Sequence, residues 1–322
     1  MRETVVITGG AGFIGSHLAE GFVRSGYAVR IIDNLTTGST TNLAPVKGQV
    51  DYRKIDIRDL DGLTDAFRGA HIVLHHGGIS SVRRSFEDPA LIHDVNVTGT
   101  LNVFAAAIRA GVRKVINASS SSVYGENGAE LQIETAVPRP LSPYGLSKWM
   151  GELYATQFGR LAAIEIVSLR YFNVFGPRQN LDSGYAAVIP LFIRKLADGA
   201  HPVIFGDGTQ TRDFTFVDNI VEANLRVAKA SLMPGTVLNV ATGTRISLNE
   251  LVNVLNEIFG AVIKPMYEPE RLGDIKYSCA DIHLSEEFLG DYTVTKFREG
   301  LMKTARWFLE VTGRTKKCVE DP

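Results

Sequence analysis

Short apolar runs alternate with longer amphipathic stretches along the first half of the chain. The runs are brief and rich in β-branched residues, which predicts buried strands. They are Thr4–Thr8, Ala28–Ile32, 51–55, Ile72–His75, 112–117 and 164–169. Between them, residues 16–25, a stretch ending at Phe67 and residues 89–111 carry apolar residues at helical spacing. This alternation predicts an α/β fold, with a doubly wound parallel sheet covered by helices on both faces.

The alternation loosens after about residue 173. A helix over 218–229 and a strand over 236–241 are still expected, and Ser247 with Glu250 forms the sequence pattern of a capping box. We therefore expect a first domain over residues 1–175, with contributions from about 213–242. Residues 176–322 are expected to form a smaller α/β substrate-binding lobe interwoven with it.

A glycine-rich turn joins the first strand to the first helix, with Gly9, Gly12 and Gly15 spaced as G-x-x-G-x-x-G. A tight turn, close backbone approach to a pyrophosphate and close helix–strand packing each need a missing side chain. Asp33 follows Gly15 by 18 positions, near the ~20 expected for a carboxylate that binds the adenosine ribose. These features predict a Rossmann-type domain that binds NAD, since a carboxylate there repels the 2′-phosphate of NADP.

Composition and charge exclude several classes of partner. The 322 residues include 34 basic and 35 acidic side chains, for a net charge of −1. No basic stripe is present, which disfavours nucleic acid and anionic membrane, and no apolar run reaches the ~18 residues of a membrane span. The N-terminal residues do not resemble a signal peptide, and two cysteines, Cys279 and Cys318, are too few for a disulfide framework. We therefore expect a cytoplasmic protein.

Tyr144 and Lys148 lie four residues apart, which places them on one face if this segment is helical. An ammonium beside a phenol favours the phenolate, so we expect a lowered tyrosine pKa and a role in taking a proton from a substrate hydroxyl. Residues 118–125 follow a strand and contain four serines, whose hydroxyls can donate to a developing alkoxide. Because ligands bind at the carboxyl ends of parallel strands, these groups should meet a bound nicotinamide there.

Two further pairs of polar residues carry weaker signals. His75 and His76 are adjacent in a predicted strand, so they should point to opposite faces. No other ligand set accompanies them, and we expect structural or cofactor-lining roles and no metal site. Arg212 and Arg271 lie in loops, where they would either clamp a diphosphate or remain solvated.

Together these motifs resemble the extended short-chain dehydrogenases/reductases over about residues 4–312. The resemblance is carried by the glycine turn, Asp33, the serine run with Val123-Tyr124-Gly125, Tyr144-x3-Lys148, Arg170-Tyr171-Phe172-Asn173 and Thr211-Arg212-Asp213. Within this group the chain is most similar to the UDP-glucose and UDP-N-acetylglucosamine 4-epimerases. That similarity implies reversible, NAD-dependent inversion at C4 of a UDP-hexose through a transient 4-keto intermediate.

The resemblance also implies roles for individual residues. Tyr144 would be the acid/base, Lys148 would bind the nicotinamide ribose, and Ser120 would contact the sugar O4, with Ser121 and Ser122 as alternatives. The implied cofactor-binding residues are Gly9, Gly12, Phe13, Ile14, Gly15, Asp33, Asn34, Asp56, Ile57, His76, Gly77, Asn96, Tyr144, Lys148 and Tyr171. The implied substrate-binding residues are Arg84, Ser120, Ser121, Ser122, Tyr144, Asn173, Val188, Phe205, Arg212, Arg271, Asp274 and Ser278.

Other reactions of the group remain alternatives. Dehydratases and decarboxylases carry acidic residues just before the Val-Tyr-Gly tyrosine, where this chain has Ser121 and Ser122. Asn173 favours a neutral sugar over glucuronate, although Arg84 and its neighbour Arg83 leave an acidic sugar open. Ser278 lies three residues before Asp281, at a position where a small side chain leaves room for an acetamido group.

Two implications concern assembly and activity. Relatives form homodimers through a four-helix bundle, which here implies the helices 89–111 and 143–159. Their apolar residues would lie at that interface or in the core; they are Val97, Leu101, Phe104, Leu153 and Phe158. A non-catalytic NAD(H)-binding scaffold is a further alternative, disfavoured because Ser120, Tyr144 and Lys148 are all intact.

Overall fold

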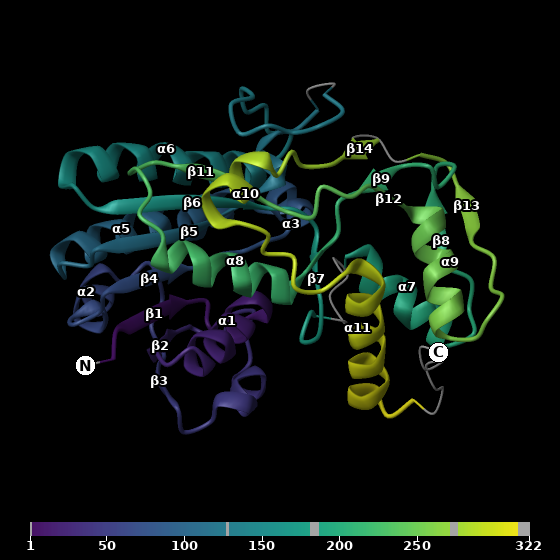
Figure 1. Cartoon of the computed structure of the whole chain (residues 1–322), viewed down its shortest axis with the longest axis horizontal. Coiled ribbons are helices and arrows are strands. Elements are labelled where there is room, and N and C mark those ends of the chain that lie inside the picture. Colours follow the sequence, from purple (N-terminus) through teal and green to yellow (C-terminus); the bar gives the residue numbers. More distant parts are fainter. Residues whose placement is uncertain (1, 127–128, 181–186, 271–275, 315–322) are drawn as a thin grey trace.

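The computed structural model describes residues 2–126, 129–180, 187–270 and 276–314 (Figure 1). Within them, a seven-stranded parallel sheet has the order β11-β6-β5-β4-β1-β2-β3. Its strands are β1 (Thr4–Thr8), β2 (Ala28–Ile32), β3 (Val50–Arg53), β4 (Ile72–His75), β5 (Lys114–Ser120), β6 (Glu165–Tyr171) and β11 (Val237–Val240). The predicted doubly wound α/β fold class is confirmed.

Helices cover both faces of this sheet. One face packs against η1 (Thr40–Val46), α1 (Phe13–Arg24), α8 (Val217–Lys229) and α10 (His283–Leu289), and the other against α2 (Leu60–Phe67), α5 (Gly99–Arg109) and α6 (Pro143–Ala162). Because neighbouring residues of a strand point to opposite faces, Ile7 of β1 enters the first core and Val6 enters the second. Because every neighbouring pair of strands in this sheet is parallel, the carboxyl ends of all seven strands lie at one edge.

The single helix predicted over 89–111 is wrong in detail, because a π-helical turn interrupts it. The segment consists of α4 (Pro89–His93), the turn η2 (Asp94–Thr98) and α5. Asn96, in the turn, is buried and bonds both the N–H and the C=O of Ile79, at 2.8 and 3.0 Å. Pro89–Arg109 is long and apolar enough for a membrane span by composition alone, but half of it is buried and it packs against α2 and α6. It is therefore a helix of the core.

The remaining elements form a second group with its own apolar core (Figure 1, right). They are β7 (Val174–Phe175), α7 (Val188–Ala197), β8 (Val203–Phe205), β9 (Thr211–Arg212), β10 (Thr215–Phe216), β12 (Ile246–Ser247), α9 (Leu248–Ile258), β13 (Met266–Glu268), β14 (Tyr277–Ser278) and α11 (Phe297–Thr312). The predicted capping box is confirmed, since Ser247 and Glu250 bond each other's backbone N–H at the start of α9. Two short elements, α3 (Val82–Glu87) and η3 (Ser121–Val123), lie near the edge of the sheet.

Candidate active site

A cavity of about 920 Å³ runs along the carboxyl ends of the strands. Its walls come from the turn after β1, the residues that follow β2, β3, β4, β5 and β6, and the start of α6. Ligands of doubly wound sheets bind at this edge, because the loops there diverge to opposite faces. The cavity is therefore the candidate active site.

The glycine turn leaves its backbone open to the cavity. Gly9 has a left-handed φ of +67°, and a Cβ there would lie 2.5 Å from the carbonyl oxygen of His76. At Gly15 a Cβ would lie 2.1 Å from the Gly9 carbonyl oxygen, so helix α1 packs against the turn. Gly12 is the N-cap of α1, and no side chain caps the first N–H groups of the helix. These N–H groups are the donors that a pyrophosphate requires.

Asp33 ties the end of β2 to the same turn. Its Oδ2 accepts from the Ala11 N–H at 3.0 Å, and its Oδ1 accepts from the Leu35 N–H at 2.7 Å. The side chain is buried but lines the cavity. A fixed carboxylate beside a glycine turn fits the ribose and pyrophosphate of NAD.

The two adjacent histidines point to opposite faces, as expected. His75 bonds the hydroxyls of Thr8 at 2.8 Å and Thr100 at 2.9 Å, whereas His76 bonds the hydroxyl of Tyr171 at 2.9 Å and lines the cavity. Burial, helped by the charge of Lys148, lowers the pKa of His76 to about 3, so the ring is neutral. Among the described residues, no group of three or more His, Cys, Asp or Glu is arranged to hold a metal.

The serine, tyrosine and lysine predicted to be catalytic come together at the ends of β5 and α6. Ser142 caps α6, so Tyr144 lies in its first turn and Lys148 one turn later. The Ser120 side chain acts on the Tyr144 phenol, and Lys148 Nζ donates to the carbonyl oxygen of Ala118 at 2.9 Å. All three line the cavity. Chain segments some 25 residues apart thus place a phenol, a hydroxyl and an amine at one wall.

The predicted lowering of the tyrosine pKa is wrong for this structure. Burial raises the pKa of Tyr144, and the hydrogen bond with Ser120 only partly opposes this. Burial also lowers the pKa of Lys148 to about 8. The same enclosed environment therefore disfavours the charged form of both groups.

The predicted substrate residues fall into three sets. Arg84, Asn173, Ser121 and Ser122 line the cavity together with the catalytic group. Val188, Phe205, Arg212 and Ser278 lie in α7, β8, β9 and β14, outside the cavity lining given by the described residues. Arg212 and Ser278 are register partners in neighbouring parallel strands. Arg271 and Asp274 lie outside the described residues.

The cofactor set is nearly complete at the cavity. Phe13, Ile14, Asn34, Asp56, Ile57, Gly77 and Tyr171 line it, as do the glycines and Asp33. Asn96 does not; it lies behind the wall and reaches Ser147 Oγ, which in turn donates to the Tyr144 carbonyl oxygen at 2.7 Å. It therefore connects η2 with the first turn of α6.

Three residues around the site were missed by the sequence reasoning. Glu152 accepts from Ser119 and pairs with Arg170 in a buried ion pair at 2.7 Å; its spacing of four from Lys148 could have revealed it. Asn224 of α8 donates to the Tyr171 hydroxyl at 2.8 Å, a contact that no local pattern signals. Gln179 presents a buried side-chain oxygen without a partner among the described residues, and lines the cavity.

Comparison with known proteins shows the family to which the chain belongs. The model of the NAD dependent epimerase/dehydratase family matches residues 5–241. A putative UDP-glucose 4-epimerase from Methanocaldococcus jannaschii is 38% identical over 306 residues, which cover 94% of this chain and 97% of that protein. A UDP-N-acetylglucosamine 4-epimerase from Methanobrevibacter ruminantium M1, solved in complex with UDP-N-acetylmuramic acid, is 39% identical with a TM-score of 0.92 over 97% of this chain and 100% of its own. The UDP-glucose 4-epimerase of Thermus thermophilus, solved in complex with NAD, is 34% identical with a TM-score of 0.85 over 95% and 98%. The chain therefore belongs to the NAD-dependent epimerase/dehydratase family.

Proposed function

We propose that the protein catalyses reversible epimerisation at C4 of a UDP-hexose, with NAD as its cofactor. One observation carries the proposal: Ser120, Tyr144 and Lys148 line the same cavity as the glycine turn and Asp33. The cavity therefore brings together a phenol that can accept a proton and the groups that fit a dinucleotide. This is what removal of a proton and a hydride from one carbon requires.

In this reaction Tyr144 takes the proton from the sugar O4 while Ser120, which lines the same cavity, holds the same oxygen. The chemistry that oxidised NAD supplies, when bound, is reversible acceptance of a hydride from C4. The 4-keto sugar then turns about its phosphate linkage so that its opposite face takes the returning hydride at C4, and Tyr144 returns the proton to O4. No net oxidation results.

Tyr144 needs a neighbouring positive charge to act as a base. Burial raises the pKa of its phenol, so the phenolate is disfavoured in the protein alone. A cationic group beside the ring reverses that preference. Lys148, one turn along α6, and the charge of an oxidised nicotinamide in the cavity would both favour the phenolate. We infer that Tyr144 becomes a competent base only when the cavity is occupied.

The second group of elements would hold the UDP-sugar, while residues 1–175 and the returning segment 213–242 hold NAD. Val188, Phe205, Arg212 and Ser278 are the described candidates in this group, and Asn173 lies just before its first strand. The neighbouring register of Arg212 and Ser278 supports their joint action on one ligand. The small side chain of Ser278 leaves room for an acetamido group, so we propose UDP-N-acetylglucosamine and UDP-N-acetylgalactosamine as substrates besides UDP-glucose and UDP-galactose.

Competing activities meet specific obstacles. A dehydratase or decarboxylase of the family would need a carboxyl group beside Ser120, but Ser121 and Ser122 stand there. The nearby carboxylate of Glu152 is buried in its pair with Arg170. Glucuronate remains the second candidate substrate, because Arg84 lines the cavity and would attract a carboxylate. A non-catalytic NAD(H) scaffold would not need the assembled group at all.

The test is to incubate the purified protein with each of the four neutral UDP-hexoses, and with UDP-glucuronate, without added reductant. We expect interconversion of at least one neutral pair at C4. Tyr144→Phe should abolish it while UDP-sugar binding persists; Tyr154→Phe, a tyrosine of α6 packed in the core, is the matched control. No interconversion of any pair would reject the proposal, and accumulation of NADH or loss of water would favour the other reactions.

We also propose that the protein forms a homodimer through α6. Leu153 and Leu161 of this helix are exposed, at 50% and 83% of their surface, and a partner helix packed on α6 would cover them. Two of the residues first considered for the interface, Val97 and Phe104, are buried within the monomer and belong to its core. Light scattering should give twice the chain mass, and Leu153→Glu should reduce it.

A further inference from the structure

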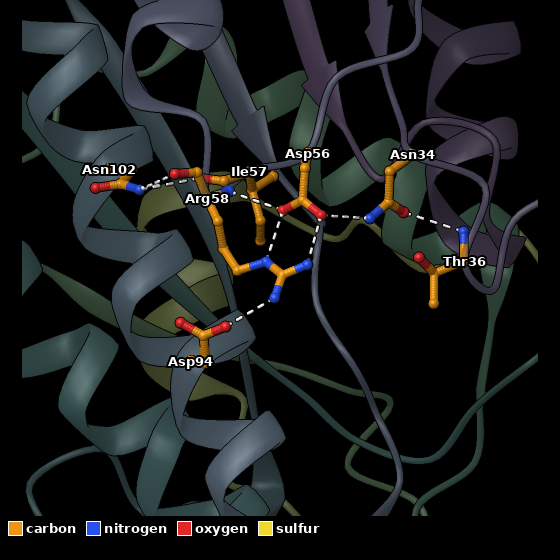
Figure 2. Close-up of polar contacts among 7 residues, drawn as sticks. All are labelled: Asn34, Thr36, Asp56, Ile57, Arg58, Asp94 and Asn102. Atoms are coloured by element: carbon orange, nitrogen blue, oxygen red, sulfur yellow. Dashed lines mark hydrogen bonds and ion pairs between the residues drawn. The ribbon is translucent and has the colours of Figure 1, made fainter.

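Arg58 lies between two carboxylates at the end of the cavity where β3 ends (Figure 2). Its Nε and Nη2 donate to the two oxygens of Asp56 at 3.0 and 2.8 Å, a two-point ion pair. Its Nη1 donates to Asp94 of the π-helical turn η2 at 2.7 Å. The resemblance implies that Asp56 and Ile57 touch adenine, and it assigns no role to Arg58.

The Asp56 carboxylate is held at both of its oxygens by neighbouring groups of the protein. Its Oδ1 accepts from the N–H and the Nε of Arg58, and its Oδ2 accepts from the Nη2 of Arg58 and the Nδ2 of Asn34. An ionised carboxylate has about four acceptor positions, and these four bonds fill them. The guanidinium also holds the pKa of Asp56 well below its usual range, so the group stays ionised. Asp56 therefore holds the loop together, and its side chain, 29% exposed, still lines the cavity.

The backbone of the same loop is braced from the other side. Asn102 of α5 donates to the carbonyl oxygens of Arg58 at 2.9 Å and Ile57 at 3.4 Å, and both its contacts are drawn in Figure 2. Asn34 accepts from the Thr36 N–H at 3.0 Å, which links the loop after β2 to the loop after β3. The backbone at Ile57, which lines the cavity, is thus held by side chains of neighbouring elements.

We propose that Arg58 is a positioning residue for the adenine end of NAD. Its guanidinium, held between Asp56 and Asp94, fixes the loop 56–58 so that the base meets the backbone of Ile57 in a preset orientation. The brace is firm because η2 is itself anchored, through Asn96, to Ile79 and to Ser147 of α6. This inference rests on the cavity holding NAD, and it does not depend on which sugar is turned over.

The first test measures NAD affinity by isothermal titration, and NAD retained per chain after gel filtration. Arg58→Ala should bind NAD about tenfold more weakly, the loss expected when one charged hydrogen-bonding partner is removed. Arg58→Lys keeps the charge but not the two-point geometry, so its NAD affinity should lie between those of the native protein and Arg58→Ala. Arg68→Ala is the matched control, because Arg68 is exposed and pairs with Asp65 at the surface end of α2; it should not change NAD affinity.

The second test separates positioning from general loosening. With nicotinamide hypoxanthine dinucleotide, which lacks the adenine amino group, the native protein should bind more weakly than with NAD, and Arg58→Ala should reduce that preference. If Arg58→Ala weakened the binding of both dinucleotides equally, the proposal would be overturned. So would a fall in kcat at saturating NAD with unchanged NAD affinity, since a positioning residue at adenine should leave kcat nearly constant.

A double-mutant cycle tests the role of Asp56. Asp56→Asn should weaken NAD binding as Arg58→Ala does. In the Arg58→Ala background it should cause little further loss of NAD affinity, because both changes release the same loop. Additive losses would instead show that Arg58 and Asp56 do not act through one loop, and would overturn the proposal. If no UDP-hexose is turned over but these binding results hold, the epimerase proposal fails and this one stands.

Discussion

The two ends of the cavity are built on different principles. At the adenine end, charged side chains pair with one another while remaining partly in water, and Arg58 keeps 40% of its side chain exposed. At the catalytic end, Tyr144, Lys148 and His76 are shielded from water, and burial is the largest cause of each of their pKa shifts. Ion pairing sets the protonation of Asp56, whereas loss of water sets that of Tyr144.

This difference separates holding a ligand from transforming it. Exposed ion pairs are individually weak, but several of them can orient a loop without removing it from water. Proton transfer needs a group whose charged and neutral forms are close in free energy. In a site shielded from water, burial disfavours the charged form, and a neighbouring charge of opposite sign can offset that cost. The protein places its ionised residues at one end and its shielded titratable residues at the other.

Replacing the lysine of the catalytic end should have the largest effect. Lys148→Met should lower kcat at least about a hundredfold, the usual range for a group that supports acid–base transfer. The same variant should be more stable without ligands. Burial lowers the pKa of Lys148 from 10.5 to about 8, so the unfolded chain takes up a proton that the folded chain lacks between these values.

The sign follows from linkage: the cost of burying Lys148 is complete below pH 8 and disappears as the pH rises to 10.5. Urea unfolding at pH 7 should therefore give a larger free energy of unfolding for Lys148→Met than for the native protein. The difference between the two free energies should be smaller at pH 10. An equal gap at both values would mean that Lys148 is solvated when folded.

The buried ion pair behind the serine loop should dominate stability. Glu152→Gln leaves the Arg170 guanidinium, only 3% exposed, without its charge partner. We expect a loss of about 3–5 kcal/mol in the free energy of unfolding. Glu222→Gln, which breaks the half-exposed pair with Arg226 on α8, should cost less than about 1 kcal/mol. Chemical denaturation of both variants measures the contrast, and similar losses would contradict it.

Acid should act first on the catalytic end. Burial lowers the pKa of His76 from 6.5 to about 3. The contribution of this residue to the free energy of unfolding is therefore complete above pH 6.5 and declines as the pH falls towards 3. His76→Gln should reduce this decline. It should not remove it, because burial also lowers the pKa of His75 and of His17. The measurement is the slope of unfolding free energy against pH between 7 and 5, and an unchanged slope would show that His76 is not the group responsible.

Salt should produce the smallest effect, and only at the adenine end. Ions screen partly exposed pairs such as Arg58–Asp94, whereas buried groups are screened much less. Raising the salt concentration from 0.05 to 0.5 M should weaken NAD binding by about threefold. The value of kcat at saturating NAD should not change. A fall in kcat with unaltered NAD affinity would reverse the assignment of the two ends.

Much of the site followed from short-range patterns. The glycine spacing, Asp33 and the Tyr144–Lys148 interval were all recognisable, and the structure brings them to one cavity. Glu152 continues the same helical spacing and was overlooked. Arg58 was hidden because an arginine among acidic residues in a loop usually remains a solvated surface group. Nothing local signals Asn224, since it meets Tyr171 only through the packing of α8 against the sheet.

By itself the sequence determined the alternation of strands and helices, the glycine turn and the helical face that carries Tyr144 and Lys148. These depend on residues within a few positions of each other, where backbone geometry is set by local side chains. Only the tertiary structure decided that 89–111 contains a π-helical turn, that Arg58 bridges Asp56 and Asp94, and that the Tyr144 pKa is raised. Each of these depends on burial and on partners distant in the chain, and both are properties of the whole packed molecule.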